Sequence, residues 1–188
     1  LYTTKRERER FMNVELMLLT VLQGLRTQIL DAGMLFFTHL GDAGFIWAAL
    51  TAVLLVFRRT RRVGCVLAAA LIDAVLCNLL LKPLVARIRP CDILADVQLL
   101  ISRPDDFSFP SGHTAASFAS VTALWLAGKK QWAMAALPVG VLIAFSRMYL
   151  CVHYPTDILG GVILGAACGW AGAWLVKKAE RRMAIPRS

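Results

Sequence analysis

The chain has 188 residues, of which 58% are hydrophobic, and its mean hydropathy is +0.62. A water-soluble domain of this size would lack the polar residues needed to cover its surface, so the composition excludes that class and favours a membrane protein. The net charge of +9 could suggest nucleic-acid binding, but the basic residues lie in short clusters between apolar runs, which is typical of membrane topology signals. We therefore expect one all-α domain over 1–188, a polytopic membrane helix bundle that binds no nucleic acid.

Four basic clusters divide the chain. By the positive-inside rule we expect all four on the cytoplasmic side, so the chain should cross the membrane an even number of times between consecutive clusters. The clusters are Lys5/Arg6/Arg8/Arg10, Arg58/Arg59/Arg61/Arg62, Lys129/Lys130 and Lys177/Lys178/Arg181/Arg182/Arg187.

The first apolar block is the hardest to assign. Residues 1–11 are expected to be a disordered start or a tag, and 43–57 make one crossing. An even number of crossings then requires a partner from 11–40, although Arg26 and Asp31 interrupt that stretch. In the alternative, 11–40 lies along the membrane surface, which leaves five crossings and puts the N-terminus outside.

The remaining crossings are clearer, and they bring the predicted total to six. Each is an apolar run of about the length that a helix needs to span a bilayer. These runs are 63–81, 113–128, 131–151 and 156–176. The polar segments 82–112 and 152–155 are then exoplasmic.

The first motif follows the 63–81 run. Six residues separate Lys82 from Arg89, which precedes Pro90. Two cations at this spacing can converge on one anion if the chain turns, and Pro83 and Pro90 favour a turning, non-helical path. Taken alone, the pair equally fits an ordinary membrane-edge cluster whose charged ends reach the headgroups.

The next stretch, 92–102, alternates acids with apolar residues, which predicts an interfacial helix on the bilayer that borders the lipid entrance, with Leu99 and Leu100 on its apolar face. The acids of this exoplasmic region are interpreted as solvated loop residues. They are Asp92, Asp96, Asp105 and Asp106.

The second motif is Pro110-Ser111-Gly112-His113, at the start of the 113–128 run. Ser111 can cap this helix, Gly112 lets backbone N–H groups approach a ligand, and a helix N-terminus favours negative charge. A capping role alone explains Ser111 but gives no reason for His113 at a membrane edge.

The third motif runs from Ser146 and Arg147 through His153 to Asp157. A carboxylate that accepts the Nδ1–H of His153 would fix the tautomer and leave Nε2 as a nucleophile. Arg147 suits the bidentate binding of phosphoryl oxygens.

Together the three motifs resemble the signature of the type 2 phosphatidic acid phosphatase (PAP2) superfamily, which also includes glucose-6-phosphatases and vanadium haloperoxidases. Every defined position of Lys-x6-Arg-Pro, Pro-Ser-Gly-His and Ser-Arg-x5-His-x3-Asp matches. The resemblance implies a PAP2/haloperoxidase-like helical core and a small bacterial membrane member. A haloperoxidase is disfavoured because this chain is membrane-embedded.

The resemblance also implies roles for the matching residues. His153 attacks phosphorus to form a phosphohistidine, Asp157 orients it, and His113 protonates the leaving oxygen and then activates water. No metal and no other cofactor is implied. The implied phosphate-binding residues are Lys82, Arg89, Ser111, Gly112 and Arg147.

The expected function is hydrolysis of a lipid phosphate or diphosphate at the outer face of a bacterial plasma membrane. Undecaprenyl diphosphate, phosphatidylglycerol phosphate and phosphatidic acid are candidate substrates that the motifs do not rank. A phosphotransferase using the same phosphohistidine and a non-catalytic lipid-binding or transport protein remain as alternatives. The expected partners are the substrate and membrane lipids, and the oligomeric state is open.

Five further residues are given structural roles. His39 matches no motif position. Asp73 and Asn78 lie within an apolar run, where we expect interhelical hydrogen bonds. Cys91 and Cys151 are expected to be free thiols, with a disulfide between them as the alternative.

Overall fold

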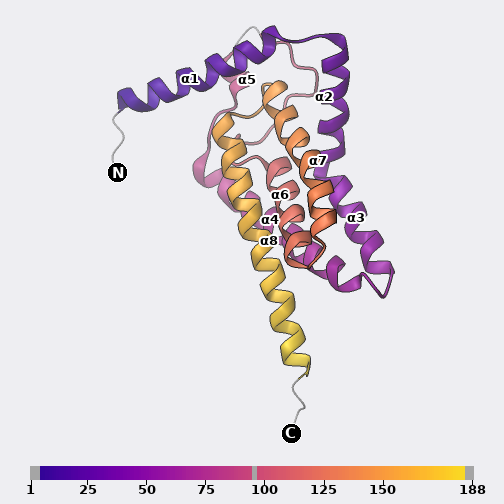
Figure 1. Ribbon diagram of the computed structural model, residues 1–188. Helices are drawn as coiled ribbons and strands as arrows, with labels where there is room; N and C mark the ends of the chain where they lie inside the picture. Colours follow the sequence, from indigo (N-terminus) through magenta and orange to yellow (C-terminus); the bar gives the residue numbers. More distant parts are fainter. Residues whose placement is uncertain (1–4, 95–96, 185–188) are drawn as a thin grey trace.

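The computed structural model describes residues 5–94 and 97–184, and this part of the chain is an all-α helix bundle (Figure 1). Its elements are α1 (Lys5–Gly24), α2 (Gln28–Gly41), the 3-10 helix η1 (Asp42–Gly44), α3 (Phe45–Val56), α4 (Arg61–Val85), α5 (Pro90–Ile93), α6 (Gly112–Leu126), α7 (Lys130–Tyr149) and α8 (Pro155–Ala184).

Four segments of the described chain are long and apolar enough to cross a membrane, as a multi-pass protein requires. They are Gln28–Val56, Arg61–Ile93, Lys130–Tyr149 and Pro155–Met183. Because α2 and α3 lie within one of these segments, the two separate crossings that we expected from 11–40 and 43–57 are not found. The predicted six crossings therefore do not correspond to six long helices in the described residues.

A kink separates α2 from α3. Ala43 has φ 50° and Gly44 has φ 69°, so two consecutive residues adopt left-handed backbone that a continuous helix cannot contain. The kink interrupts an apolar segment of 29 residues. It thereby places the polar side chain of Asp42 between two apolar helices.

Helix α1 runs across the end of the bundle at which α5 lies (Figure 1). Leu19 is fully buried against Cys151 and Tyr154, which belong to the α7–α8 connection. The predicted disorder over 1–11 is wrong for residues 5–11, which are helical, while residues 1–4 lie outside the described part of the chain.

Glycines allow α8 to approach its neighbours closely. A Cβ on Gly165 would lie 2.4 Å from the carbonyl oxygen of Ala115, and one on Gly161 would lie 2.8 Å from that of Ser111, both in or next to α6. Small residues at such spacing let helix backbones pack closely in membrane proteins. This packing fixes the N-terminal ends of α6 and α8 side by side.

The interfacial helix that we expected over 92–102 is not found in the described residues of that stretch, where α5 ends at Ile93 and 97–102 is non-helical. Leu99 and Leu100 are half-buried and pack against a cluster that includes Tyr149 and Val152. Their apolar pattern therefore reflects packing onto the end of α7, and the lipid entrance at these leucines stays a prediction.

Two expectations about buried polar groups and thiols have different outcomes. Cys91 and Cys151 are both free thiols, as predicted. The expected interhelical hydrogen bonds of Asp73 and Asn78 are not found at Asp73 Oδ2 or Asn78 Nδ2, which have no partner among the described residues.

Candidate active site

The ends of four helices converge on one region of the bundle. The last turns of α4 and α7 carry Lys82 and Arg147, and the first turns of α6 and α8 carry His113 and Asp157. Helix α4 continues through Pro83 and ends at Ala86, which has φ 48°, so the predicted turn lies a few residues later than we expected. All three sequence motifs contribute to this region.

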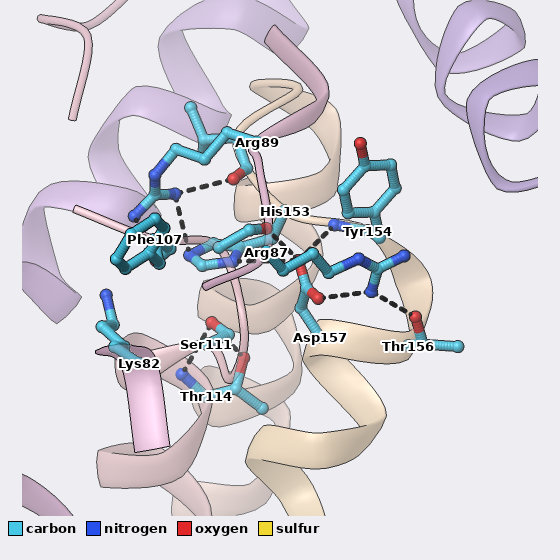
Figure 2. Close-up of polar contacts among 12 residues, drawn as sticks. Lys82, Arg87, Arg89, Phe107, Ser111, Thr114, His153, Tyr154, Thr156 and Asp157 are labelled. Carbon is cyan, nitrogen blue, oxygen red and sulfur yellow. Dashed lines mark hydrogen bonds and ion pairs between the residues drawn. The ribbon is translucent and has the colours of Figure 1, made fainter. Parts of the chain in front are cut away.

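His153 lies at the centre of the site, in the connection between α7 and α8 (Figure 2). Its ring is 1% exposed, with Nδ1 3.4 Å from Asp157 Oδ2 and Nε2 3.3 Å from a guanidinium nitrogen of Arg89. Burial, and then the nearby cations Arg89 and Arg147, lower the pKa of His153 to about 3 although Asp157 opposes this shift. The ring is therefore neutral at pH 7, and with Nδ1–H donated to Asp157 the lone pair lies on Nε2, where it faces the N–H of Arg89.

Asp157 is fully buried in the first turn of α8 and accepts several hydrogen bonds. The backbone N–H of Tyr154 donates at 2.9 Å, Ser108 donates through its hydroxyl, and Arg87 donates through its guanidinium at 2.6 Å. These donors favour the charged carboxylate and fix its direction toward His153.

Sequence reasoning missed Arg87 and Ser108. Arg87 is one of the cations on the predicted exoplasmic side, where the positive-inside rule disfavours it, but it was assigned no role in the site. Its guanidinium also lies over the ring of Tyr154, 3.8 Å from the centroid, and donates to Glu15 of α1 at 2.5 Å. Ser108 carries no such signal, because serine is common in loops.

Glu15 ties α1 to the site, which the sequence also gave no reason to expect. Its carboxylate accepts from the backbone N–H of Thr156 at 3.0 Å and from the Thr156 hydroxyl at 2.6 Å. The same carboxylate pairs with Arg87. Helix α1 thus helps to hold the residues that orient Asp157.

Arg89 is held rigidly beside His153. It donates to the carbonyl oxygen of Val152 at 2.7 Å and to that of Asp106 at 2.8 Å, and its side chain is 3% exposed. These bonds fix the plane of the guanidinium, so one edge always faces the histidine.

The carboxylate of Asp106 bridges Lys82 and Arg89. Partial burial raises the pKa of Asp106, but hydrogen bonds from the two cations lower it to about 2. Asp106 is therefore a charged member of the site. It is an exposed loop residue, as predicted, but its pairing with the two cations was not predicted. An anion that binds both cations must compete with this carboxylate.

Arg147 has unused hydrogen-bonding capacity. It is 5% exposed and donates to the hydroxyl of Thr38 at 2.6 Å, while its Nε has no partner among the described residues. Leaving a buried cationic donor unpaired is costly, so this side chain is poised for an anion.

Ser111 caps α6, as predicted. Its hydroxyl oxygen accepts from the backbone N–H of Thr114 at 3.4 Å, and its own N–H donates to the carbonyl oxygen of Asp157 at 3.1 Å. Gly112 begins the helix that Ser111 caps, beside Asn78 of α4. The N-terminus of α6 thus faces the same region as the cations, which favours bound anions.

His113 reaches a different set of neighbours. Its Nε2 lies 3.0 Å from Asp42 Oδ1, and it lines a cavity of about 570 Å³ that α3, α4 and α6 border. Asn78 is the other polar side chain in the cavity wall, which is otherwise small or apolar. Asp42 was missed because it matches no motif and lies 71 residues from His113 in the sequence.

The site lacks the features of a metal centre. In the part of the chain that the structure describes, no three His, Cys, Asp or Glu side chains converge as metal ligands would. Its positive charge comes instead from Lys82, Arg89 and Arg147, which surround a buried His–Asp pair. A helix bundle with such a site defines a membrane enzyme that acts on phosphate groups.

Comparison with known proteins identifies the family. A sequence model described as the PAP2 superfamily matches residues 62–181. The chain therefore belongs to the PAP2 superfamily, as its three motifs predicted, and it is a multi-pass membrane phosphatase of that type.

Similar proteins come from several organisms. An undecaprenyl-diphosphatase of Sulfolobus acidocaldarius is 34% identical over 155 residues, which cover 82% of this chain and 73% of that protein. The crystal structure of Aquifex aeolicus LpxE superposes with a TM-score of 0.74 at 30% identity, covering 85% of this chain and 94% of that one. A transmembrane PAP2-type phosphatidylglycerolphosphate phosphatase from Bacillus subtilis gives 0.73 at 27% identity, covering 95% and 89%.

Proposed function

We propose that the protein hydrolyses the phosphate or diphosphate ester of a membrane lipid through a phosphohistidine at His153. The observation that carries this proposal is the buried, neutral His153, which pairs with Asp157 and directs Nε2 toward Arg89. The unpaired Nε of the nearby Arg147 adds a donor for the phosphate.

In the first step, Nε2 of His153 attacks phosphorus and the bond from phosphorus to the leaving oxygen breaks. His113 gives a proton to that oxygen, and Asp157 stabilises the positive charge that forms on His153. In the second step, water attacks the phosphohistidine, His113 takes the proton from water, and phosphate leaves with His153 restored.

Charge stabilisation comes from groups around the phosphate. The cationic side chains and the backbone N–H groups at the start of α6 supply donors where negative charge develops, which is the role that metal ions have in other phosphoryl-transfer enzymes. The residues proposed for this task are Lys82, Arg89, Ser111, Gly112 and Arg147. The proposed reaction accordingly needs no metal or other cofactor.

A lipid substrate is supported by the apolar cavity that reaches His113. An alcohol or phosphate leaving from phosphorus would lie near the proton donor, and an attached chain could extend into this volume of about 570 Å³. The similar proteins are named for undecaprenyl diphosphate and phosphatidylglycerolphosphate. We propose these two lipids and phosphatidic acid as candidate substrates.

We further propose that the site lies on the exoplasmic face of a plasma membrane, in a single domain over 1–188. The basic clusters at 58–62, 129–130 and 177–182 lie at the end of the bundle opposite the site (Figure 1). By the positive-inside rule that end is cytoplasmic.

The number of crossings proposed is five, as in the alternative prediction, although here only α1, and not all of 11–40, would lie along the surface. The α2–α3 pair, α4, α7 and α8, which are the segments long enough to cross a bilayer, would span the membrane. Helix α6 has 15 residues, too few to cross a bilayer alone, and it would make the fifth crossing inside the bundle, with its first turn, which carries His113, at the outer surface. Helix α1 would lie at the outer surface, which places the N-terminal basic cluster outside. This arrangement is tested by introducing cysteines near each end of α1 and labelling them with a reagent that does not cross the membrane. Both ends should be labelled from outside, and labelling of one end only would contradict the arrangement.

The activity is tested by phosphate release in detergent from the three candidate lipids, with EDTA present. We expect release from at least one lipid, and we expect His153→Ala to abolish it. No release from any of them, or a strict requirement for a divalent cation, would contradict the proposal.

A further inference from the structure

The carboxylate of Asp42 lies between two imidazole rings. Its Oδ1 is 3.0 Å from Nε2 of His113, and its Oδ2 is 2.8 Å from Nδ1 of His39. His39 is mostly exposed, with 62% of its side chain accessible, whereas the His113 side chain is 18% exposed. One end of the carboxylate therefore faces solvent and the other faces the site.

The backbone around Asp42 is shaped for this contact. A Cβ on Gly41 would lie 2.7 Å from Cδ2 of His113, so the end of α2 packs directly against the imidazole edge. The left-handed residues Ala43 and Gly44 then turn the chain into α3. The kink thus holds the carboxylate of Asp42 beside the imidazole ring. Because the Asp side chain is short, the position of the backbone determines the position of the carboxylate.

The other charges around His113 act against its protonated form. Arg147 comes from α7 and Lys82 from α4, while the nearest carboxylate of α8, Asp157, is engaged by His153 and Arg87. Burial, and then Arg147 and Lys82, lower the pKa of His113 to about 4, whereas Asp42 acts in the opposite direction. In the free site the ring is therefore neutral at pH 7, and it becomes a charged proton donor only when the negative charge of a bound phosphate adds to that of Asp42.

We propose that Asp42 is the positioning residue of the proton donor His113, which rests on the function proposed above. Asp42 accepts the Nε2–H of His113 throughout the reaction, so the proton that moves is the one on Nδ1. No described group bonds Nδ1. When the bond from phosphorus to the leaving oxygen breaks, Nδ1–H gives its proton to that oxygen and His113 becomes neutral.

The second step restores the starting state. The lone pair on Nδ1 takes a proton from the attacking water while the Nε2–H stays on Asp42. The two histidines of the site then use carboxylates in complementary ways. Asp157 bonds Nδ1 of His153 and frees Nε2 for attack, and Asp42 bonds Nε2 of His113 and frees Nδ1 for proton transfer.

A proton donor matters only when the leaving group needs a proton, which gives a selective test. The variants are Asp42→Asn, the conservative Asp42→Glu, and the matched control Asp92→Asn, which removes a carboxylate that pairs with the exposed Arg103. The substrates are phenyl phosphate, 4-nitrophenyl phosphate and the best lipid phosphate found for the wild type.

Asp42→Asn is expected to lower kcat/KM by about 10- to 100-fold for phenyl phosphate and the lipid, and by less than about 3-fold for 4-nitrophenyl phosphate. The high-pH limb of kcat/KM for phenyl phosphate should move to lower pH, because an amide no longer stabilises the imidazolium. Asp42→Glu should recover most of the loss, and Asp92→Asn should resemble the wild type.

Two results would overturn the inference. One is an equal loss on both aryl phosphates in an Asp42→Asn protein whose melting temperature matches the wild type. The other is no loss on phenyl phosphate. If instead the wild type turns over no phosphate ester at all, the proposed function itself fails, and the inference fails with it.

Discussion

A guanidinium nitrogen of Arg89 lies 3.3 Å from Nε2 of His153. The guanidinium also donates to backbone carbonyl oxygens of Asp106 and Val152, which fix its plane beside the ring. Burial, and then this neighbouring cation, keep the imidazole neutral by lowering its pKa, which a nucleophile requires. The guanidinium of Arg89 therefore lies beside both the attacking Nε2 atom and the position of the phosphate that Nε2 would attack.

Replacing this guanidinium tests its directional role. Arg89→Lys keeps the charge but cannot make the two carbonyl bonds and face His153 at once. We expect kcat/KM for a lipid phosphate to fall by about 100-fold or more. The exposed Arg103 offers a control, and Arg103→Lys should stay within about 2-fold of the wild type. Equal activity of Arg89→Lys and the wild type would contradict the role given to the guanidinium.

Asp106 is expected to weaken anion binding, because its carboxylate occupies donors of Lys82 and Arg89. Asp106→Asn removes that competing charge, so inorganic phosphate should inhibit the variant at a several-fold lower concentration than the wild type. The neighbouring Asp105→Asn is the matched control and should change inhibition little. A higher inhibition constant in Asp106→Asn would show that the carboxylate helps to build the site.

The pKa of His153 predicts how stability depends on pH. This pKa is about 3 in the folded protein, whereas an imidazole in an unfolded chain titrates near ~6.5. Below ~6.5 the unfolded chain binds a proton that the folded protein does not, so stability is lost as the pH falls toward 3. The melting temperature in detergent should drop between pH 7 and pH 4, and His153→Asn should drop less. If the melting temperatures of the wild type and His153→Asn fell equally with pH, burial of a neutral His153 would not be the cause of the pH dependence.

The close packing of α8 on α6 should tolerate no side chain at Gly165. A Cβ there would meet the carbonyl oxygen of Ala115 at 2.4 Å, and backbone cannot move aside as a side chain can. Gly165→Leu should lower the yield of folded protein, and it should lower the melting temperature measured by thermal unfolding in detergent. Ala167→Leu is the control, because that position is exposed on the same helix. A stable Gly165→Leu protein would mean that the two helices can separate without loss.

The parts of the site that could be predicted are those that local sequence determines. His153 and Asp157 lie four positions apart across the start of α8, and Ser111 caps the helix that follows it. Spacing alone brings such residues together. The motif residues Lys82 and Arg147 were likewise placed correctly near the ends of their helices.

The contacts that could not be predicted join distant segments. Asp42 reaches His113 across 71 positions, and Arg87 reaches Asp157 across 70. No periodic pattern links these pairs, since each depends on where a kink or turn brings the chain. The ion pairs of Asp106 were not predicted for the same reason, because an acid in a polar loop gives no sign of the cations that it will meet.

The fold was predicted well where apolar runs are separated by charges and poorly where they are not. Helices α4, α7 and α8 follow the expected runs. The α2–α3 segment was divided incorrectly because the kink at η1 does not end the apolar stretch. The interfacial helix expected over 92–102 was not found, because side chains that pack on protein and side chains that face lipid are equally apolar and the sequence does not distinguish them.

The central claim is that phosphate passes through His153, and a rapid-quench experiment tests it most directly. Wild-type protein mixed with a radiolabelled lipid phosphate should carry label that is stable in base, labile in acid and located at His153 by peptide mapping, while His153→Ala should carry none. Label on another residue, or turnover by His153→Ala at a rate near that of the wild type, would contradict the mechanism.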